Sequence, residues 1–173
     1  MVVRHLGKCF NPIATGTFLS VGGRAYDLFW GTTLRATTRL HKVLDRVTGG
    51  RLGRHFPGGQ QVVWITTLGR KSGEWRRTPL LAVHEDGNPD RPWLVTGSNA
   101  GQAAMPGWVF NVRAHDEGTL EIEGVSMPVR FEEAVGEERA RLYAQLAETW
   151  AAYRQYEQNA GREIPVFRVL PLR

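Results

Sequence analysis

The densest group of residues that could do chemistry lies at one tight turn. The run Gly69-Arg70-Lys71-Ser72-Gly73 separates two segments rich in β-branched and aromatic residues. Two glycines can let the amides of a turn face a ligand, Ser72 adds a hydroxyl donor, and Arg70 with Lys71 adds two positive charges. The run is therefore a candidate cradle for a phosphate or carboxylate group. Taken alone, the solvated tip of a charged hairpin explains it better.

Two observations limit what this turn can be. Arg76 and Arg77 follow it on the returning segment, and neighbouring strand residues point to opposite faces, so only one of them can share the cradle. The glycine that a Walker loop needs directly before its Lys-Ser pair is missing, and the chain has no Gly-x-Gly-x-x-Gly. We therefore exclude a doubly wound nucleotide-binding fold.

Metal and acyl-transfer chemistry are not indicated. The five histidines show no metal-ligand spacing, Cys9 is the only cysteine, and no Gly-x-Ser-x-Gly elbow is present. We predict no metal site and a reducing compartment.

Aromatic residues recur at three-residue spacing at positions Trp150, Tyr153 and Tyr156, so they should lie near one face of a helix. Such a stripe is ordinarily part of a core, and the other explanation is a substrate pocket.

The elements that must position these residues follow from periodicity and turn signals. Short runs of valine, isoleucine, threonine and aromatic residues predict strands at about 61–68, 75–84, 93–98, 119–123, 126–133 and 165–170. Connections at 69–74 and 124–125 are short enough for antiparallel hairpins. Helices are expected near 108–113 and 137–158, the second with Glu137 and Glu138 at its start and Gly161 past its end.

These elements predict an α+β fold that is mainly β, with one short and one long helix. Six short antiparallel strands favour a small closed or half-open barrel, because closing the sheet removes exposed strand edges. A hydrophobic share of 42% in 173 residues suits one globular domain. We place that domain at 56–173.

The preceding segment, 1–55, is expected to be a basic amphipathic helical segment followed by a linker. Residues 1–60 carry nine Lys or Arg and two acids, a net +7, whereas 61–173 carries 13 basic and 15 acidic residues, a net −2. The globular part is therefore not a nucleic-acid binder. A basic helix that displays Phe29 and Trp30 could lie on an anionic membrane surface. It could also pack on this domain or on a second subunit.

No signal peptide or membrane-spanning run is recognised, since Asn11, Pro12 and Gly16 interrupt the N-terminal apolar residues. We expect a cytoplasmic protein, with peripheral membrane contact through the N-terminal segment as an open alternative. The sequence leaves the oligomeric state open.

Four ordered elements together resemble the deazaflavin (F420)-dependent nitroreductase family. The run Thr67-Leu68-Gly69-Arg70-Lys71-Ser72-Gly73, followed by Arg76, Pro79 and Leu80, resembles the signature T-x-G-R-K-[ST]-G-x-x-R-x-x-P-L. The other three elements are Gly97-Ser98-Asn99-Ala100-Gly101, Pro106-Gly107-Trp108-Val109-Phe110-Asn111-Val112, and Tyr153 and Tyr156 before Ile164-Pro165. The similarity covers roughly 56–170, and four ordered elements are far more specific than one.

The resemblance implies a split β-barrel that holds coenzyme F420 in a groove, with its phosphate and glutamate tail on the basic hairpin. The tail would be held by Arg70, Lys71, Ser72, Gly73 and Arg76. Pro79 and Leu80 would line the groove, while Ser98, Asn99, Trp108 and Asn111 would border the deazaflavin ring. Trp108 and Asn111 taken alone would more often serve packing and capping.

The resemblance also implies hydride transfer from reduced F420 to a flat electrophilic acceptor, such as a quinone or a nitroaromatic compound. Ser98 or Tyr153 would hydrogen-bond the acceptor oxygen, and Tyr153 or solvent would supply the proton. Trp150, Tyr153 and Tyr156 would line the substrate pocket. The chain departs from the family at Asn99, where lysine is frequent, and at Trp150, where tyrosine is usual.

Two other functions stay open at this stage. A related split-barrel oxidoreductase could retain FMN instead of using F420. A non-enzymatic protein could bind the coenzyme or a lipid, with the basic helix as its membrane tether. The presence of bound flavin distinguishes the first from an F420 enzyme, and turnover distinguishes the second.

Overall fold

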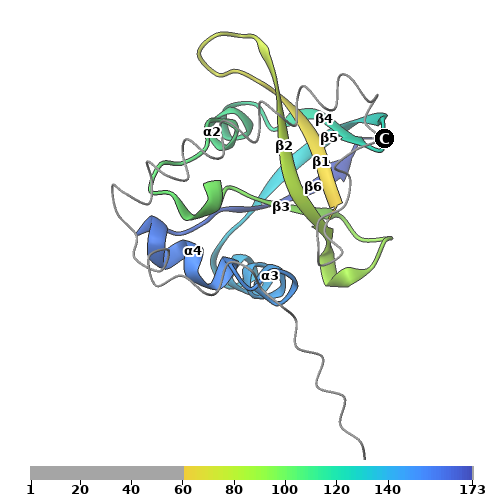
Figure 1. Ribbon diagram of the computed structural model, residues 1–173. Coiled ribbons are helices and arrows are strands. Elements are labelled where there is room, and N and C mark those ends of the chain that lie inside the picture. Colours follow the sequence, from red (N-terminus) through yellow and green to blue (C-terminus); the bar gives the residue numbers. More distant parts are fainter. Residues whose placement is uncertain (1–60, 173) are drawn as a thin grey trace, which may run out of the picture.

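Six antiparallel strands close into a barrel in the computed structural model, which describes residues 61–172. Neighbouring strands follow the order β1-β2-β3-β6-β5-β4, and β4 pairs with β1 to complete the barrel (Figure 1). The strands are β1 Gln61–Leu68, β2 Trp75–His84, β3 Trp93–Thr96, β4 Glu117–Ile122, β5 Val125–Ala134 and β6 Val166–Pro171. This confirms the predicted mainly β barrel and its six strands. The helical segment predicted within 1–55 lies outside the described residues.

Both predicted hairpins are present. β1 and β2 pair from Gln61↔Ala82 to Leu68↔Trp75, so residues 69–74 form the connecting loop. β4 and β5 pair up to Ile122↔Val125, which makes Glu123 and Gly124 the turn, one residue earlier than predicted. Both have positive φ, 51° and 83°, the conformation of a type I′ turn that suits the twist of a hairpin.

The interior of the barrel is filled by alternate strand residues. Val63 and Ile65 of β1 are fully buried, and they pack with Leu120, Phe131 and Phe167 from other strands. A side chain at Gly118 would place its Cβ 2.3 Å from the carbonyl oxygen of Thr66, so the approach of β4 to β1 requires glycine. Period-two alternation therefore decides which residues form this core.

Within residues 61–172, three α-helices cover the barrel: α2 Gly107–Ala114, α3 Gly136–Thr149 and α4 Tyr153–Ala160. Two short 3-10 turns, η1 Glu85–Gly87 and η2 Asn99–Gly101, follow β2 and β3. A second core lies under α3 and α4 and includes Leu94, Leu142 and Val166. Figure 1 shows α3 and α4 together on one side of the strands, with α2 apart from them near the β1–β2 hairpin.

The prediction of one long helix over 137–158 is wrong, because the chain breaks between α3 and α4. Trp150 ends α3 with φ −136° and ψ 100°, and its amide donates to the Leu146 carbonyl at 2.9 Å. The break lets Tyr153 pack into the second core, where Tyr143 donates to the Tyr153 carbonyl at 2.7 Å. Tertiary burial thus overrides a continuous helical pattern, and Trp150 does not share a helix face with Tyr153.

The predicted ends of this helical region are otherwise confirmed. Glu137 and Glu138 lie in the first turn of α3, where negative charge suits the helix dipole. Gly161 follows α4 in the left-handed conformation with φ 60°, and its amide donates to the Glu157 carbonyl at 2.9 Å. None of the helices within 61–172 is long and apolar enough to cross a membrane.

Candidate functional site

The basic hairpin loop is tightly closed by its own backbone. The amide of Gly69 donates to the Glu74 carbonyl at 2.8 Å, and the amide of Gly73 donates to the Gly69 carbonyl at 2.7 Å. A Cβ at Gly69 would lie 2.7 Å from Ser72 Oγ and 3.0 Å from the Glu74 carbonyl oxygen. Gly69 is therefore required by close approach, and Gly73 by its positive φ of 66°.

The expectation that the loop amides face a ligand does not hold. Five of the six amides in 69–74 donate within the protein, namely those of Gly69, Arg70, Ser72, Gly73 and Glu74. Ser72 Oγ is also engaged, because it accepts from the Glu74 amide at 3.3 Å and from Arg76 Nη2 at 3.1 Å. Anion binding at this loop would therefore depend on its cationic side chains.

The side chains of Arg70 and Lys71 are exposed at the loop. Within 61–172, no carboxylate pairs with either of them. The Arg70 guanidinium lies over the Phe110 ring, with 4.7 Å between Cζ and the ring centroid. Such stacking holds the head group in place and leaves its charge available. Two cations without anionic partners in the described structure suit an anionic ligand.

The two following arginines lie on opposite faces, as predicted. Arg76 stays with the loop and forms an ion pair with Glu74 at 3.1 Å. Arg77 donates to Glu121 at 2.7 Å, and its Cζ lies 3.9 Å from the centroid of the Trp64 ring. Only Arg76 can therefore share an anion with Arg70 and Lys71.

Asn111 ties the hairpin loop to α2. Its Oδ1 accepts from the Arg70 amide at 3.2 Å, its Nδ2 donates to Thr67 Oγ1 at 3.2 Å, and the residue is buried. Trp108, one turn earlier, is also buried and packs on Phe167, with ring centroids 5.3 Å apart. Both residues serve packing and loop anchoring, and their expected place beside a coenzyme ring stays a prediction.

The loop after β3 carries Ser98 and Asn99 in an unusual backbone conformation. Asn99, Ala100 and Gly101 have φ of 48°, 52° and 75°, so three consecutive residues are left-handed. Asparagine tolerates this region better than most residues. Asn99 Nδ2 donates to the Ala104 carbonyl at 3.0 Å. β3 ends at Thr96, two residues earlier than predicted, and the Gly97 amide donates to the Pro165 carbonyl at 3.0 Å.

Tyr153 brings α4 to this loop from inside the protein. Its hydroxyl accepts from Thr96 Oγ1 at 3.2 Å, and Ser98 lies near enough to influence its pKa. Burial raises the pKa of the Tyr153 phenol, and Thr96 and Ser98 oppose this shift only in part. The phenol is therefore protonated at neutral pH. Ser98 is half-buried and is the more accessible of the two hydroxyls.

Trp150 and Tyr156 are half-buried and pack against the second core. The Tyr156 ring meets the Tyr153 ring edge-on, with centroids 5.4 Å apart. The three aromatic residues therefore have the packing role that the core explanation requires. Of the three, only Trp150 and Tyr156 are partly exposed, so only these two can also line a substrate pocket.

The hairpin loop and the loop after β3 both contact α2. Asn111 contacts the hairpin loop, while Val109 packs on Gly97, where an added Cβ would lie 2.7 Å from Val109 Cγ2. Figure 1 shows α2 beside the hairpin, with the segment after β3 on the same side of the barrel. Pro79 and Leu80 are half-buried on β2, opposite Trp64 and Val63.

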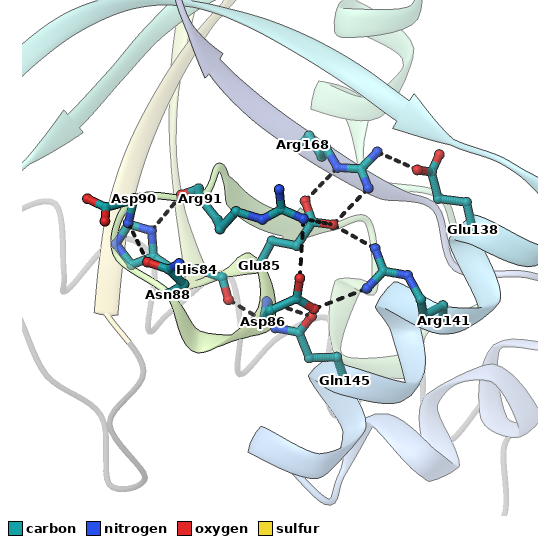
Figure 2. A network of polar contacts seen from close by, with 10 residues as sticks. All are labelled: His84, Glu85, Asp86, Asn88, Asp90, Arg91, Glu138, Arg141, Gln145 and Arg168. Carbon is teal, nitrogen blue, oxygen red and sulfur yellow. Dashed lines mark hydrogen bonds and ion pairs between the residues drawn. The ribbon is translucent and has the colours of Figure 1, made fainter.

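Sequence reasoning missed a buried ionic network on another part of the barrel. Glu85, 2% exposed, accepts from Arg168 Nε at 2.7 Å, from Arg168 Nη2 at 2.9 Å and from Arg141 Nη2 at 2.6 Å (Figure 2). Hydrogen bonding from Arg168 is the main cause that lowers the pKa of Glu85 to about 2, against the opposing effect of burial. The only local signal was Arg168 between apolar neighbours in a predicted strand.

A hollow of about 860 Å³ lies beside this network, between β2, β3 and α3. Its lining includes His84 and Trp93, whose rings are stacked with centroids 3.6 Å apart, as well as Arg141 and Glu148. None of the predicted site residues lines it. The hollow is therefore separate from the hairpin and from α2.

Comparison with known proteins gives consistent matches. Residues 37–171 match a family model described as F420H(2)-dependent quinone reductase. F420H(2)-dependent quinone reductase Rv1261c of Mycobacterium tuberculosis (strain ATCC 25618 / H37Rv) is 31% identical over 134 residues, which are 74% of this chain and 85% of the relative. Putative F420H(2)-dependent quinone reductase Rv3178 of the same strain is 30% identical over 121 residues, 70% of this chain and 98% of the relative.

Two solved structures share the fold. An F420-H2 dependent reductase, FDR-A, superposes with a TM-score of 0.54 and 33% identity, covering 62% of this chain and 92% of that chain. A protein solved as a domain-swapped dimer superposes with a TM-score of 0.56 and 28% identity, covering 80% of this chain and 98% of that chain.

Proposed function

The chain belongs to the F420H(2)-dependent quinone reductase family, and from that premise we propose that it is an oxidoreductase that uses reduced F420 to reduce a quinone. The observation that carries the proposal, beside family membership, is the exposed pair Arg70 and Lys71, which has no carboxylate partner within 61–172. A polyanionic coenzyme tail needs such cations. The comparisons give no support to FMN as the cofactor.

The described residues fit the coenzyme at the hairpin. Arg70, Lys71 and Arg76 would hold the phosphate and glutamate tail, while Ser72 and Gly73 keep the loop in shape. Charge-assisted hydrogen bonds of this kind contribute about 1.5–3 kcal/mol each when partly desolvated. When bound, reduced F420 supplies a hydride. We retain Pro79, Leu80 and Asn99 as proposed contacts of the coenzyme.

The acceptor would lie at the loop after β3. Ser98 is the accessible hydroxyl there, so we assign it the hydrogen bond to the acceptor oxygen as negative charge develops. Tyr153 lies behind Ser98 with a protonated phenol, so it can support that bond and return a proton through Ser98. Trp150 and Tyr156 would flank a flat acceptor. A nitroaromatic compound is a second acceptor of the same shape.

Titration of reduced F420 into the purified full-length chain under anaerobic conditions tests the proposal. We expect quenching of tryptophan fluorescence, followed by oxidation of the coenzyme when menadione is added. A nitroimidazole in a parallel assay tests the second acceptor. Absence of both quenching and oxidation would refute the proposed function. A yellow preparation with extractable flavin would favour the FMN enzyme, and quenching without turnover would favour a binding protein.

Removal of the Tyr153 hydroxyl should slow the reaction without weakening coenzyme binding. We expect Tyr153→Phe to lower kcat about fivefold, the effect of losing one hydrogen bond worth about 1 kcal/mol, with an unchanged KM for reduced F420. Tyr143→Phe is the matched control, since this tyrosine donates only to a backbone carbonyl in the same core. Steady-state kinetics of both variants check the prediction, and equal kcat values for the two would contradict it.

We also propose that the protein works at the cytoplasmic face of a membrane, where quinones are abundant. The motivation is the net +7 of residues 1–60 together with Phe29 and Trp30. The full-length chain should sediment with anionic vesicles, less so at high salt, and a chain without residues 1–55 should stay in solution. Equal sedimentation of the two forms would end this proposal. Circular dichroism of the shortened chain verifies that it is folded.

A further inference from the structure

Arg162, directly after Gly161, donates a set of hydrogen bonds to backbone carbonyls that no sequence motif predicted. Its Nε donates to the Ala103 carbonyl at 3.0 Å, and its Nη2 lies 3.1 Å from the Gly97 carbonyl oxygen. The same Nη2 lies 3.3 Å from the Gln102 and 3.4 Å from the Ala104 carbonyl oxygens. One guanidinium thus donates hydrogen bonds to four carbonyls of the segment 97–104, which we call the β3–α2 loop.

The β3–α2 loop needs such a partner because its backbone has little regular structure. Carbonyls outside helices and strands must find donors elsewhere or stay in water. Asn99 to Gly101 are three consecutive left-handed residues, and carbonyls on both sides of them meet the Arg162 guanidinium. An arginine offers five donors in a rigid plane, whereas lysine offers one rotating ammonium. The site therefore suits arginine specifically.

The segment that follows Arg162 in the chain is fixed by several hydrogen bonds. The carbonyl of Ile164, two residues later, accepts from Arg139 Nε at 2.9 Å and from Arg139 Nη2 at 2.6 Å. Glu157 of α4 accepts from the Ile164 amide at 3.0 Å and pairs with Arg139. The Gly97 amide donates to the Pro165 carbonyl at 3.0 Å. These contacts join the segment after α4 to the start of the β3–α2 loop.

The consequence concerns two hydroxyls on different elements. Ser98 lies on the β3–α2 loop, and Tyr153 lies at the start of α4, so the approach of their hydroxyls depends on how the loop sits against α4. Arg162 follows α4 in the chain and donates hydrogen bonds to the β3–α2 loop, so it connects these two elements. Partial burial lowers the pKa of its guanidinium, which agrees with a group withdrawn from water.

We infer that Arg162 is a positioning residue, which holds the β3–α2 loop so that Ser98 stays against the Tyr153 hydroxyl during reduction of the acceptor. The part of the inference that concerns reduction of the acceptor rests on the proposed function. Its structural part, that Arg162 holds the loop, stands independently of that function.

The experiment compares Arg162→Ala and Arg162→Lys with the wild-type full-length chain by hydrogen exchange and by kinetics. The amides of Gly101 and Gln102 donate to the Ser98 and Asn99 carbonyls, so they report on the loop. In Arg162→Ala we expect their exchange to accelerate about tenfold or more. We expect kcat with menadione to fall about tenfold to 100-fold, as for reacting groups that lose their alignment. KM for reduced F420 should change by less than about threefold, because the tail is held at the hairpin.

Two further measurements distinguish positioning from general loss of stability. Added guanidinium chloride at low millimolar concentration should restore part of the kcat of Arg162→Ala, and sodium chloride at the same ionic strength should not. Arg141→Ala, which removes an arginine bonded to Glu85 and Asp86, is the control and should keep both loop exchange and kcat unchanged. Arg162→Lys should show loop exchange and kcat between those of the wild type and of Arg162→Ala. It replaces Arg162→Ala in the test if that variant does not fold.

Unchanged exchange of the loop amides in the Arg162 variants would overturn the inference. So would accelerated exchange with kcat within about twofold of wild type, since positioning would then be irrelevant to the reaction. If the wild-type chain reduces no acceptor, the proposed function fails. The exchange data alone then decide whether Arg162 holds the loop.

Discussion

Replacement of Glu85 by alanine is expected to lower the free energy of unfolding by about 3–5 kcal/mol, because it leaves the largely buried Arg168 without the carboxylate that accepts two of its hydrogen bonds. Arg168 is 17% exposed and directs two of its nitrogens at this carboxylate, and Arg141 adds a third hydrogen bond. Equilibrium unfolding in urea measures the change. Glu85→Gln should be less harmful, since the amide keeps the shape and an acceptor oxygen while it loses the charge.

A matched carboxylate on the surface provides the control for this prediction. Glu117 pairs with Arg130 at 2.8 Å, but both side chains are about half exposed, at 56% and 47%. Exposed ion pairs contribute little because water screens them. Glu117→Ala should therefore leave the urea midpoint nearly unchanged. Similar losses in Glu85→Ala and Glu117→Ala would show that burial of the network is not what stabilises the fold.

The same network predicts how stability depends on pH. The pKa of Glu85 is lowered from 4.5 to about 2 in the folded protein, so its contribution is fully present above pH 4.5. It is lost progressively as the pH falls from 4.5 toward 2, because the unfolded chain then binds the proton more readily. A shift of this size corresponds to about 3 kcal/mol. The unfolding free energy of Glu85→Gln should fall less steeply in that window, and parallel curves would contradict the assignment.

Arg70→Ala is expected to raise the KM for reduced F420 about tenfold to 100-fold, with kcat within about twofold of wild type. The reason is that Arg70 would hold the anionic tail, far from the reacting atoms, so its loss weakens coenzyme binding in the ground state and transition state alike. Loss of one charge-assisted hydrogen bond accounts for the magnitude. Steady-state kinetics with menadione in excess check it. Lys71→Ala should behave in the same way with a smaller effect.

Arg77→Ala is the matched control for the hairpin, because Arg77 is adjacent to Arg76 yet points to Glu121 and Trp64 on the other face. Its KM for reduced F420 should match that of the wild type. Salt provides an independent measure, since a higher ionic strength should raise the wild-type KM more than that of Arg70→Ala. A large fall in kcat at unchanged KM in Arg70→Ala would instead move the reaction onto the hairpin.

Three residues predicted to contact the coenzyme have supporting roles in the described structure. Ser72, Asn111 and Trp108 were expected to contact the coenzyme, and in the structure Ser72 and Asn111 hold the loop while Trp108 fills the core. A motif identifies residues that a family retains, and it does not separate those that touch a ligand from those that support them. Arg70 and Lys71 remain the direct candidates, because their side chains are exposed and have no anionic partner within 61–172.

What the sequence by itself determined was local. Short runs of valine, isoleucine, threonine and aromatic residues located all six strands, and the short connections predicted at 69–74 and 124–125 implied hairpins, because strand pattern and turn conformation depend on neighbours in the chain. The opposite faces of Arg76 and Arg77 follow from the same alternation. The ordered motifs also led to the family that residues 37–171 match.

Only the tertiary structure decided the contacts between distant parts of the chain. Closure of β4 on β1 and the break at Trp150 depend on burial against other elements, which periodicity does not encode. Glu85 meets Arg168 across 83 residues, and Arg162 meets the Gly97 carbonyl across 65. A charged side chain carries no local sign of its partner, since burial and distance are set only when the barrel closes.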